Sequence, residues 1–499
     1  MSKQTLDDFR DLVRKVKSYE EALAVMYWDL RTGAPKKGVE TRSEVIGVLS
    51  TEMFKLSIST EMGSYLEELS QADQLESLDE INRKLVLECK KEYERSVKIP
   101  PEMYQEYVVL TSQAESIWED AKRASDYAMF QPYLEKIVDF NQKFVELWGY
   151  EGHRYNTLLD MYEPGITVAK LDEVFDELRK HTVPLVLEMK NDPSKLDTSF
   201  LKQHYDVSKQ KEFSLFILKE LGYDFEAGRL DESEHPFATG LNPGDVRITT
   251  KFKPYDIAFA LFGTIHECGH ALYEQNVSSK LIGTPLCNGA SMGIHESQSR
   301  FWEIYIGSSL PFWQKYYNDL QRYFPEQLAD ISVQQFYRAI NQAQPSLIRI
   351  EADELTYNLH IMIRYELEKG LISGEIQVAD LPRLWNEKYE QYLGVKPSND
   401  AEGVLQDVHW AGGAFGYFPS YSLGNMYAAQ MIHALRLQLP HLDTLVAQGE
   451  FTPIKEWLTE KVHQFGKLLT PEEIIHNVSG EELNPAYLVK HLTSKYARS

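Results

Sequence analysis

Apolar side chains recur every three or four residues along most of the first 230 residues, with charged residues between them. In the segment from 6 to 30, Phe9, Leu12 and Val16 fall on one side of a helix whose other side is charged. Similar patterns predict helices at about 42 to 70, 78 to 97, 103 to 125, and 129 to 149. The first part of the chain is therefore predicted to be helical.

Two proline-containing segments interrupt this helical spacing of apolar residues. Pro100-Pro101 starts a new helix, because proline is tolerated in a first helical turn. Tyr162-Glu163-Pro164-Gly165 precedes a further helix that begins near Val168. No repeat, low-complexity tract or Gly/Ser linker interrupts the sequence, so we expect residues 1–499 to form one large domain.

The pattern changes at residue 235. His235-Pro236-Phe237 leads into a turn-forming cluster at 240–244. From 245 to 252, apolar residues and threonine alternate with charged and polar ones, which is the period-2 pattern of a half-buried strand. From Tyr255 the spacing is helical again and runs into His266. These observations predict a mainly α-helical fold with a small β-sheet before a buried helix.

Composition narrows the class of protein. The chain has 499 residues, of which 43% are hydrophobic and 25% are charged, as in globular proteins. A formal charge of −23 argues against binding to nucleic acid or to anionic membranes. No stretch approaches the ~18 apolar residues of a membrane span. Cys89, Cys268 and Cys287 do not form a disulfide framework, so we expect a cytoplasmic protein.

The sequence His266-Glu267-Cys268-Gly269-His270 carries the chemistry. Its two histidines lie about 40° apart around a helix and about 6 Å apart along it, so both rings can reach one metal ion. Glu267 lies on the flank of that face, where it can hold an attacking water as the catalytic base. Cys268 points to the opposite side, and we interpret it as a buried small residue.

A catalytic zinc ion usually has three protein ligands, so a third ligand should follow. The best candidate is Glu296, with His295 as its competitor; the two lie about 100° apart on a helix. Two imidazoles and one carboxylate leave the metal with a net positive charge that can activate water. The predicted ligands are therefore His266, His270 and Glu296. Zinc is expected, although cobalt and manganese accept the same ligands, and His295 becomes a second-layer or substrate residue.

Six motifs in this order resemble the signatures of the M32 metallocarboxypeptidase family. They are His235-Pro236-Phe237, Asp245-Val246-Arg247-Ile248-Thr249, His266-Glu267-Cys268-Gly269-His270, His295-Glu296-Ser297-Gln298, Ile348-Arg349-Ile350-Glu351-Ala352-Asp353 and Gly403-Val404-Leu405-Gln406-Asp407-Val408-His409-Trp410. The resemblance implies a two-lobed helical fold with a deep groove, similar to neurolysin and angiotensin-converting enzyme. It also implies one divalent metal ion per chain, a homodimer, and peptide substrates that lose single C-terminal residues, with broad preference and poor action on C-terminal proline.

Within that fold we expect residues 1–230 to form the rim of the groove and 235–430 to hold the site. The segment 403–424 mixes glycines with aromatic residues, which suits a loop closing over a ligand, although a packed core turn is equally compatible. His409 and Tyr421 are candidate donors to the substrate carbonyl and oxyanion. His409 matches the family motif, whereas Tyr421 rests on analogy with related zinc peptidases.

An exopeptidase also needs a cation that binds the terminal carboxylate. Arg349 is the leading candidate because it matches the family's IRxxAD arginine, in a stretch that we expect to be helical, with Glu351 or Asp353 as an alternative structural partner. Arg247 is a second candidate, and His235 can line the same groove or serve as a turn residue.

The strand at 245–252 is a further candidate for substrate binding, because its edge can hold an extended peptide. The alternative is that Asp245 and Arg247 form a structural ion pair. Three functions remain open from the sequence: a carboxypeptidase, an oligopeptidase or dipeptidyl carboxypeptidase on the same framework, and a scaffold in which the metal only stabilises the fold.

Overall fold

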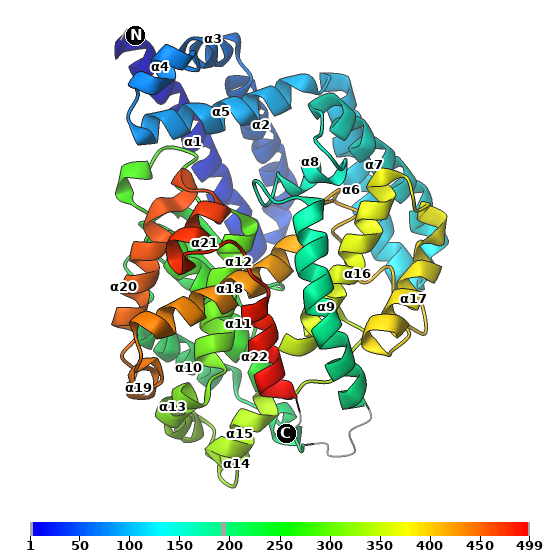
Figure 1. Cartoon of the computed structure of the whole chain (residues 1–499), viewed down its shortest axis with the longest axis vertical. Coiled ribbons are helices and arrows are strands. Elements are labelled where there is room, and N and C mark those ends of the chain that lie inside the picture. The colour runs from blue at the N-terminus through cyan, green and yellow to red at the C-terminus, as the bar shows by residue number, and fades with distance from the viewer. Residues whose placement is uncertain (1–2, 191–195, 498–499) are drawn as a thin grey trace.

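The computed structural model describes residues 3–190 and 196–497, which form a mainly helical protein with one small sheet (Figure 1). The helices before the sheet are α1 (Lys3–Thr32), α2 (Val39–Ser57), α3 (Thr60–Leu69), α4 (Ala72–Ser77), α5 (Glu80–Lys98), α6 (Pro101–Ala124), α7 (Tyr127–Trp148), α8 (Tyr155–Leu159), α9 (Val168–Lys190) and α10 (Val207–Glu220). Those after it are α11 (Ile257–Gln275), α12 (Met292–Arg300), α13 (Leu310–Tyr323), α14 (Pro325–Leu328), α15 (Val333–Ile340), α16 (Glu354–Ser373), α17 (Leu381–Leu393), α18 (Pro419–Gln438), α19 (Leu442–Gln448), α20 (Thr452–Lys461), α21 (Pro471–Ser479) and α22 (Ala486–Tyr496). The predicted fold class, mainly helical with a small sheet, is confirmed.

Two predicted helices have different limits in the structure. The segment from 42 to 70 is two helices, because Ser59 adopts extended geometry and its Oγ accepts the Met62 backbone N–H at 3.1 Å, which starts α3. The stretch around Arg349 is a single 3-10 turn, Arg349–Glu351, since Asp353 caps the start of α16 by accepting backbone N–H groups. The prediction of a helix at Arg349 was therefore wrong.

The sheet has three strands in the order β1-β3-β2, formed by β1 (Leu230–Glu232), β2 (Ala238–Asn242) and β3 (Asp245–Thr250). β3 is parallel to β1 and antiparallel to β2. The sequence predicted β3, but its proposed role as a substrate-binding edge was wrong, because strands on both sides use its backbone groups. The strand β2 was not predicted, because Gly240 was interpreted as part of a turn-forming cluster.

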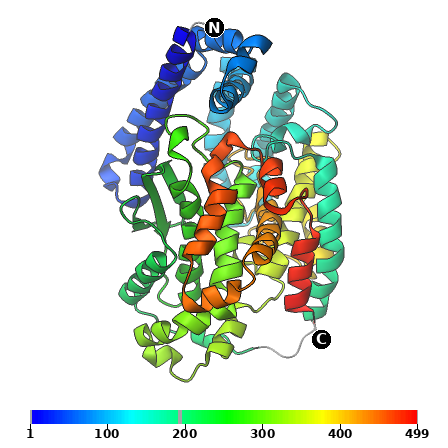
Figure 2. The same cartoon turned by 60° about the vertical axis from the view of Figure 1, so that its left-hand side comes forward.

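The centre of the molecule is built from α11, α12 and α18, which lie together in Figure 1. α11 packs against β3 on one side and α12 on the other. Figure 2 shows the sheet at the side of the molecule, next to α1. Within the described ranges, no helix combines the length and apolar content needed to cross a membrane. The two-lobed groove and the assignment of residues 1–499 to a single domain stay predictions.

Candidate metal centre

α11 presents the two motif histidines on one side of a buried helix. Its N-terminus is capped by Asp256, whose Oδ1 accepts the Phe259 N–H at 3.4 Å. Apolar residues such as Leu261 and Leu272 are buried and fix its rotation in the core. Cys268 is completely buried, as predicted.

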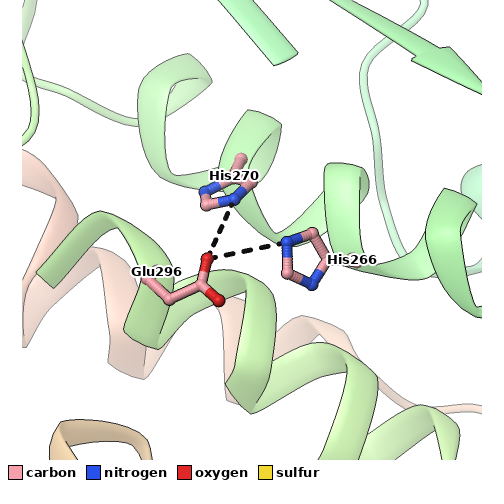
Figure 3. Close-up of side chains that lie close together, drawn as sticks. All are labelled: His266, His270 and Glu296. Atoms are coloured by element: carbon pink, nitrogen blue, oxygen red, sulfur yellow. Dashed lines mark ion pairs between the residues drawn. The ribbon is translucent and has the colours of Figure 1, made fainter. Parts of the chain in front are cut away.

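Glu296 on α12 completes the predicted set of metal ligands (Figure 3). Its Oε2 lies 3.6 Å from His266 Nε2 and 3.5 Å from His270 Nε2, and the three ligand atoms lie within 4.8 Å of one another. Two ligand atoms about 2 Å from a tetrahedral metal ion lie about 3.3 Å apart. The spacing and the chemistry of these three side chains therefore fit one divalent ion with an open position.

Two glycines allow the three central helices to approach this closely. A Cβ atom on Gly269 of α11 would lie 2.5 Å from the Gln298 carbonyl oxygen on α12. A Cβ atom on Gly424 of α18 would lie 2.5 Å from Glu296 Cγ. Any side chain at either position would push α12, and with it the carboxylate ligand, away from the histidines.

Carboxylates and a third histidine orient the ligand rings. His266 Nδ1 is 2.8 Å from Oε2 of Glu303, which also accepts a hydrogen bond from Arg300 Nη1 at 2.9 Å. Glu303 lies on a π-helix, Phe301–Gly307, that continues α12, and such helices often occur at functional sites. Hydrogen bonds of this kind fix the tautomer and ring direction of metal-binding histidines.

On the other ring, His270 Nδ1 lies 2.6 Å from His295 Nδ1, and His295 Nε2 lies 2.7 Å from Glu274 Oε1. His295 therefore contacts a ligand ring without being a ligand, which is one of the two positions that the sequence left open. Glu274 and Glu303 were not predicted from the sequence. Glu274 stands four residues after His270 on the same helix, a spacing that could have identified it. Glu303 comes from the π-helix and had no comparable signal.

Burial and the neighbouring charges shift the pKa values of the ionisable side chains at the site. Burial lowers the pKa of His266, but the Glu296 and Glu303 carboxylates outweigh that effect and raise it to about 9. Burial lowers the pKa of His270 to about 4. Burial also raises the pKa of Glu267 to about 7, in the range of a general base at neutral pH. Since metal ligation requires a neutral imidazole, ion binding would release a proton from His266.

A cavity of about 590 Å³ opens beside the three ligands. Its other lining residues include Met161, Tyr162, Pro164, Pro236, Phe237, Ala238, Glu267, Glu274, Asn288, Ser291, Met292, His295, Tyr417, Ser420, Tyr421 and Lys467. Its walls thus combine the predicted base, the first residue of the edge strand β2, and three tyrosines. This cavity can receive an extended peptide next to the metal ligands.

Of the two predicted donors to the oxyanion, Tyr421 lines the cavity and His409 lies directly behind it. His409 Nε2 is 3.3 Å from Tyr421 Oη. Burial lowers the pKa of His409 to about 4 and raises that of Tyr421 well above its usual value, so the imidazole is neutral and the phenol keeps its proton. Among the described residues, His409 Nδ1 has no hydrogen-bond partner.

Arg349 is buried at the end of the site where Tyr421 and His409 lie, but it does not line the cavity. It is 5% exposed, and its guanidinium binds Asp407 at 2.8 Å and the Tyr357 hydroxyl at 3.1 Å. The alternative that Arg349 pairs with Glu351 or Asp353 was therefore wrong. A second arginine, Arg364, binds the same Asp407 carboxylate.

The remaining two predicted substrate residues lie outside this cavity. Arg247 makes a bidentate ion pair with Asp245, at 2.8 and 2.7 Å, and its guanidinium lies over the Trp28 ring. This is the structural ion pair that the sequence left open. His235 is exposed, whereas the following Pro236 and Phe237 line the cavity.

Comparison with known proteins agrees with this geometry. Residues 8–496 match the family model of the carboxypeptidase Taq (M32) metallopeptidases. The chain is 54% identical to carboxypeptidase 1 of Bacillus subtilis, over 98% of this chain and 97% of that protein. It is 40% identical to thermostable carboxypeptidase 1 of Thermus thermophilus, over 95% and 94%. The crystal structure of the M32 carboxypeptidase from Deinococcus radiodurans superposes with a TM-score of 0.94, at 35% identity over 99% of each chain. The chain therefore belongs to the M32 family of metallopeptidases.

Proposed function

We propose that this protein is a metal-dependent carboxypeptidase that releases single C-terminal amino acids from peptides. The observation that carries the proposal is the convergence of His266, His270 and Glu296 on one point, with Glu267 beside them in a peptide-sized cavity. The names of its relatives, carboxypeptidase 1 and thermostable carboxypeptidase 1, support the exopeptidase assignment. The alternative is an oligopeptidase or dipeptidyl carboxypeptidase on the same framework.

A few groups at this site carry out the separate steps of peptide hydrolysis. When bound, the metal ion supplies a Lewis acid and makes water a better nucleophile. Glu267 takes the proton from the attacking water and later delivers it to the amine nitrogen that leaves. Its raised pKa, near 7, suits a group that must both accept and return a proton.

Tyr421 donates a hydrogen bond from its hydroxyl to the oxyanion that forms during attack. The hydroxyl is uncharged and borders the cavity, so it stabilises negative charge without binding the ground state strongly. His409 holds this hydroxyl from behind through Nε2. The pair forms one unit, in which the histidine sets the direction of the phenol.

Arg349 is the proposed source of positive potential for the terminal carboxylate. Two arginines, Arg349 and Arg364, share the single carboxylate of Asp407, which leaves a net positive charge buried behind Tyr421. A carboxylate at that end of the cavity would be attracted to this charge. The positions of Arg247 and His235 give no support to a direct substrate contact.

Broad specificity follows from recognition of the substrate backbone. β2 is an edge strand whose first residue, Ala238, lines the cavity, so the outer edge of this strand is placed to pair with an extended peptide. Backbone pairing ignores side chains. A C-terminal proline has no N–H for such contacts, which accounts for poor action on it.

Zinc is the proposed metal, with cobalt or manganese as alternatives. Two histidines and one glutamate form the ligand set of several catalytic zinc sites. Imidazole and carboxylate ligands also accept the other two ions, and availability decides between them in the cell. Metal analysis of the protein purified without added metal would identify the ion.

The protein is also proposed to act as a homodimer in the cytoplasm. α2 has a single buried residue, Ile46, and exposes Val39, Val45, Val48 and Phe54. Exposed apolar side chains on one helix are typical of a contact surface, and a second copy is the proposed partner. The free cysteines suit a reducing compartment.

A peptide of ten residues and its C-terminally amidated twin distinguish the candidate activities. We expect mass spectrometry to show a ladder of single-residue losses from the free acid and almost none from the amide, because only the acid presents a terminal carboxylate. Internal cleavage of both peptides would establish the oligopeptidase instead. Release of residue pairs would establish the dipeptidyl carboxypeptidase.

A further inference from the structure

The segment Tyr162-Glu163-Pro164-Gly165, which the sequence marks only as a break between helices, lies at the metal centre. Tyr162 and Pro164 line the cavity, whereas Glu163 points into the protein and is 1% exposed. A buried carboxylate requires a specific set of hydrogen-bond donors. The donors to Glu163 include groups on α12, the helix that carries Glu296, and on α18, which packs against α12.

The first donor belongs to α12, the helix that carries Glu296. The Gly293 backbone N–H donates to Glu163 Oε2 at 2.9 Å, and the neighbouring Met292 N–H donates to the Tyr162 carbonyl at 3.0 Å. These N–H groups are in the first turn of α12, where the helix itself offers no acceptor and its dipole favours negative charge. The segment thus fixes the start of a helix only nine residues long.

The second donor belongs to α18, on the other side of the ligand. The Tyr427 hydroxyl donates to Glu163 Oε1 at 2.8 Å. Three residues earlier on the same helix, Gly424 packs directly against Glu296, where a Cβ atom would lie 2.5 Å from the ligand's Cγ. One carboxylate therefore joins the two helices that enclose the ligand.

The close contact between Glu163 and Gly293 also leaves α12 little space to move. A Cβ atom at this position would lie 2.5 Å from Glu163 Oε2. The carboxylate therefore sits directly on the helix backbone, and a shift of α12 would break its hydrogen bond. Because Glu296 is three residues farther along α12, such a shift would carry the ligand with it.

We propose that Glu163 is a positioning residue for the metal ligand Glu296, acting by joining α12 to α18. It touches neither the metal position nor the substrate. The proposal rests on the proposed function only in taking His266, His270 and Glu296 as the metal ligands. Its consequence is that a residue outside the family motifs controls metal affinity.

Titration with Co²⁺ tests the proposal without relying on turnover, because the visible spectrum of bound Co²⁺ reports ligand geometry. In Glu163→Ala the apparent Kd for Co²⁺ should rise about tenfold, the lower end of the range for residues that orient metal ligands. The Co²⁺ spectrum should change as well. Glu163→Gln keeps the shape and one acceptor oxygen, so it should recover most of the affinity.

Glu368 offers a matched control. It is also fully buried and accepts a glycine N–H, from Gly416 at 2.9 Å, and a tyrosine hydroxyl, from Tyr155. Its third donor is Trp410, so it supports a different segment of the site. Glu368→Ala should leave the Co²⁺ affinity within about twofold of wild type, which separates positioning of the ligand from loss of a buried carboxylate in general.

Several outcomes would overturn the proposal. Folded Glu163→Ala with the wild-type Kd and spectrum would do so, and so would an equal loss of Co²⁺ affinity in Glu368→Ala. If Glu163→Ala does not fold, Tyr427→Phe decides, since it removes one hydrogen bond to Glu163. We expect its Kd to rise about two- to threefold, and an unchanged value would refute positioning. A wild-type protein that binds no Co²⁺ would refute the metal site itself, and with it the proposed function.

Discussion

The two halves of the site are built in different ways. The metal ligands stand on α11 and α12, and local helix geometry plus two close glycine contacts set their separation. His409 stands on the segment 403–418, between α17 and α18, where the structure has neither helix nor strand. One half is positioned by regular secondary structure and the other by contacts from distant parts of the chain.

Those distant contacts come from α6 and α16. From α6, Trp118 Nε1 donates to the Leu405 carbonyl at 3.0 Å and Lys122 Nζ to the Gln406 carbonyl at 2.8 Å. From α16, Glu368 accepts from the Trp410 indole at 2.7 Å. A loop bonded on both sides can be as well ordered as a helix, but its order depends on residues nearly 300 positions away. The two halves should therefore respond differently to mutation.

The largest expected effect comes from removing the base of the helical half. Glu267→Gln keeps the size of the side chain but cannot take a proton, so kcat should fall by about 10²–10⁴-fold. Metal content should remain one ion per chain, because Glu267 is not a ligand. Steady-state kinetics and metal analysis check both parts. Unchanged turnover would show that another group is the base.

The second effect tests the contact between the loop half and α18, because Tyr421 lies in the first turn of α18 and is hydrogen-bonded to His409 of the loop. Tyr421→Phe removes a proposed oxyanion donor, so kcat should fall by about 10²–10³-fold while metal affinity stays unchanged. KM should change little, because the hydroxyl acts mainly in the transition state. Steady-state kinetics with a peptide substrate would measure the effects on kcat and KM separately. A rise in KM at constant kcat would instead make Tyr421 a ground-state binding residue.

The contrast between local helix geometry in one half of the site and long-range contacts in the other also explains which features the sequence could predict. His266 and His270 follow from a spacing of four on a helix, a purely local rule, and Glu296 follows from the expected third ligand. The pairing of Arg349 with Asp407 joins residues 58 positions apart across a loop, and nothing in the local pattern indicates it. For the same reason β3 was predicted as a strand, although its central place in the sheet was not.

A third effect concerns pH and the support of the loop. Burial raises the pKa of Glu368 to about 7, only partly opposed by hydrogen bonds from Tyr155, Gly416 and Trp410 and by the charge of Arg364. Between about pH 4.5 and 7 the folded protein keeps a proton that the unfolded chain has lost, so this group reduces stability as pH rises. Glu368→Gln removes the titration.

The free energy of unfolding of Glu368→Gln, relative to wild type, should therefore increase with pH, by no more than about 3 kcal/mol across that window. Urea denaturation at pH 5 and pH 7.5 measures the change. A relative stability that is constant with pH would mean that Glu368 is ionised throughout, as the partner of its three donors. The loop would then be held by a charge, not by a neutral acid.

The smallest effect separates the two halves most cleanly. Tyr107→Phe on α6 removes only a hydroxyl, which donates to the Gly413 carbonyl and accepts from Asn141, both at 3.3 Å. Such long hydrogen bonds contribute little, so we expect a loss of stability of about 0.5–1 kcal/mol and a decrease in kcat of no more than about threefold. Metal affinity should not change, because the two hydrogen-bond partners of the Tyr107 hydroxyl lie in the loop and on α7, not on α11 or α12. Thermal unfolding, kinetics and Co²⁺ titration together test this. A weaker metal site in Tyr107→Phe would show that the halves are mechanically coupled, and that the loop helps to hold the ligands as well as the substrate.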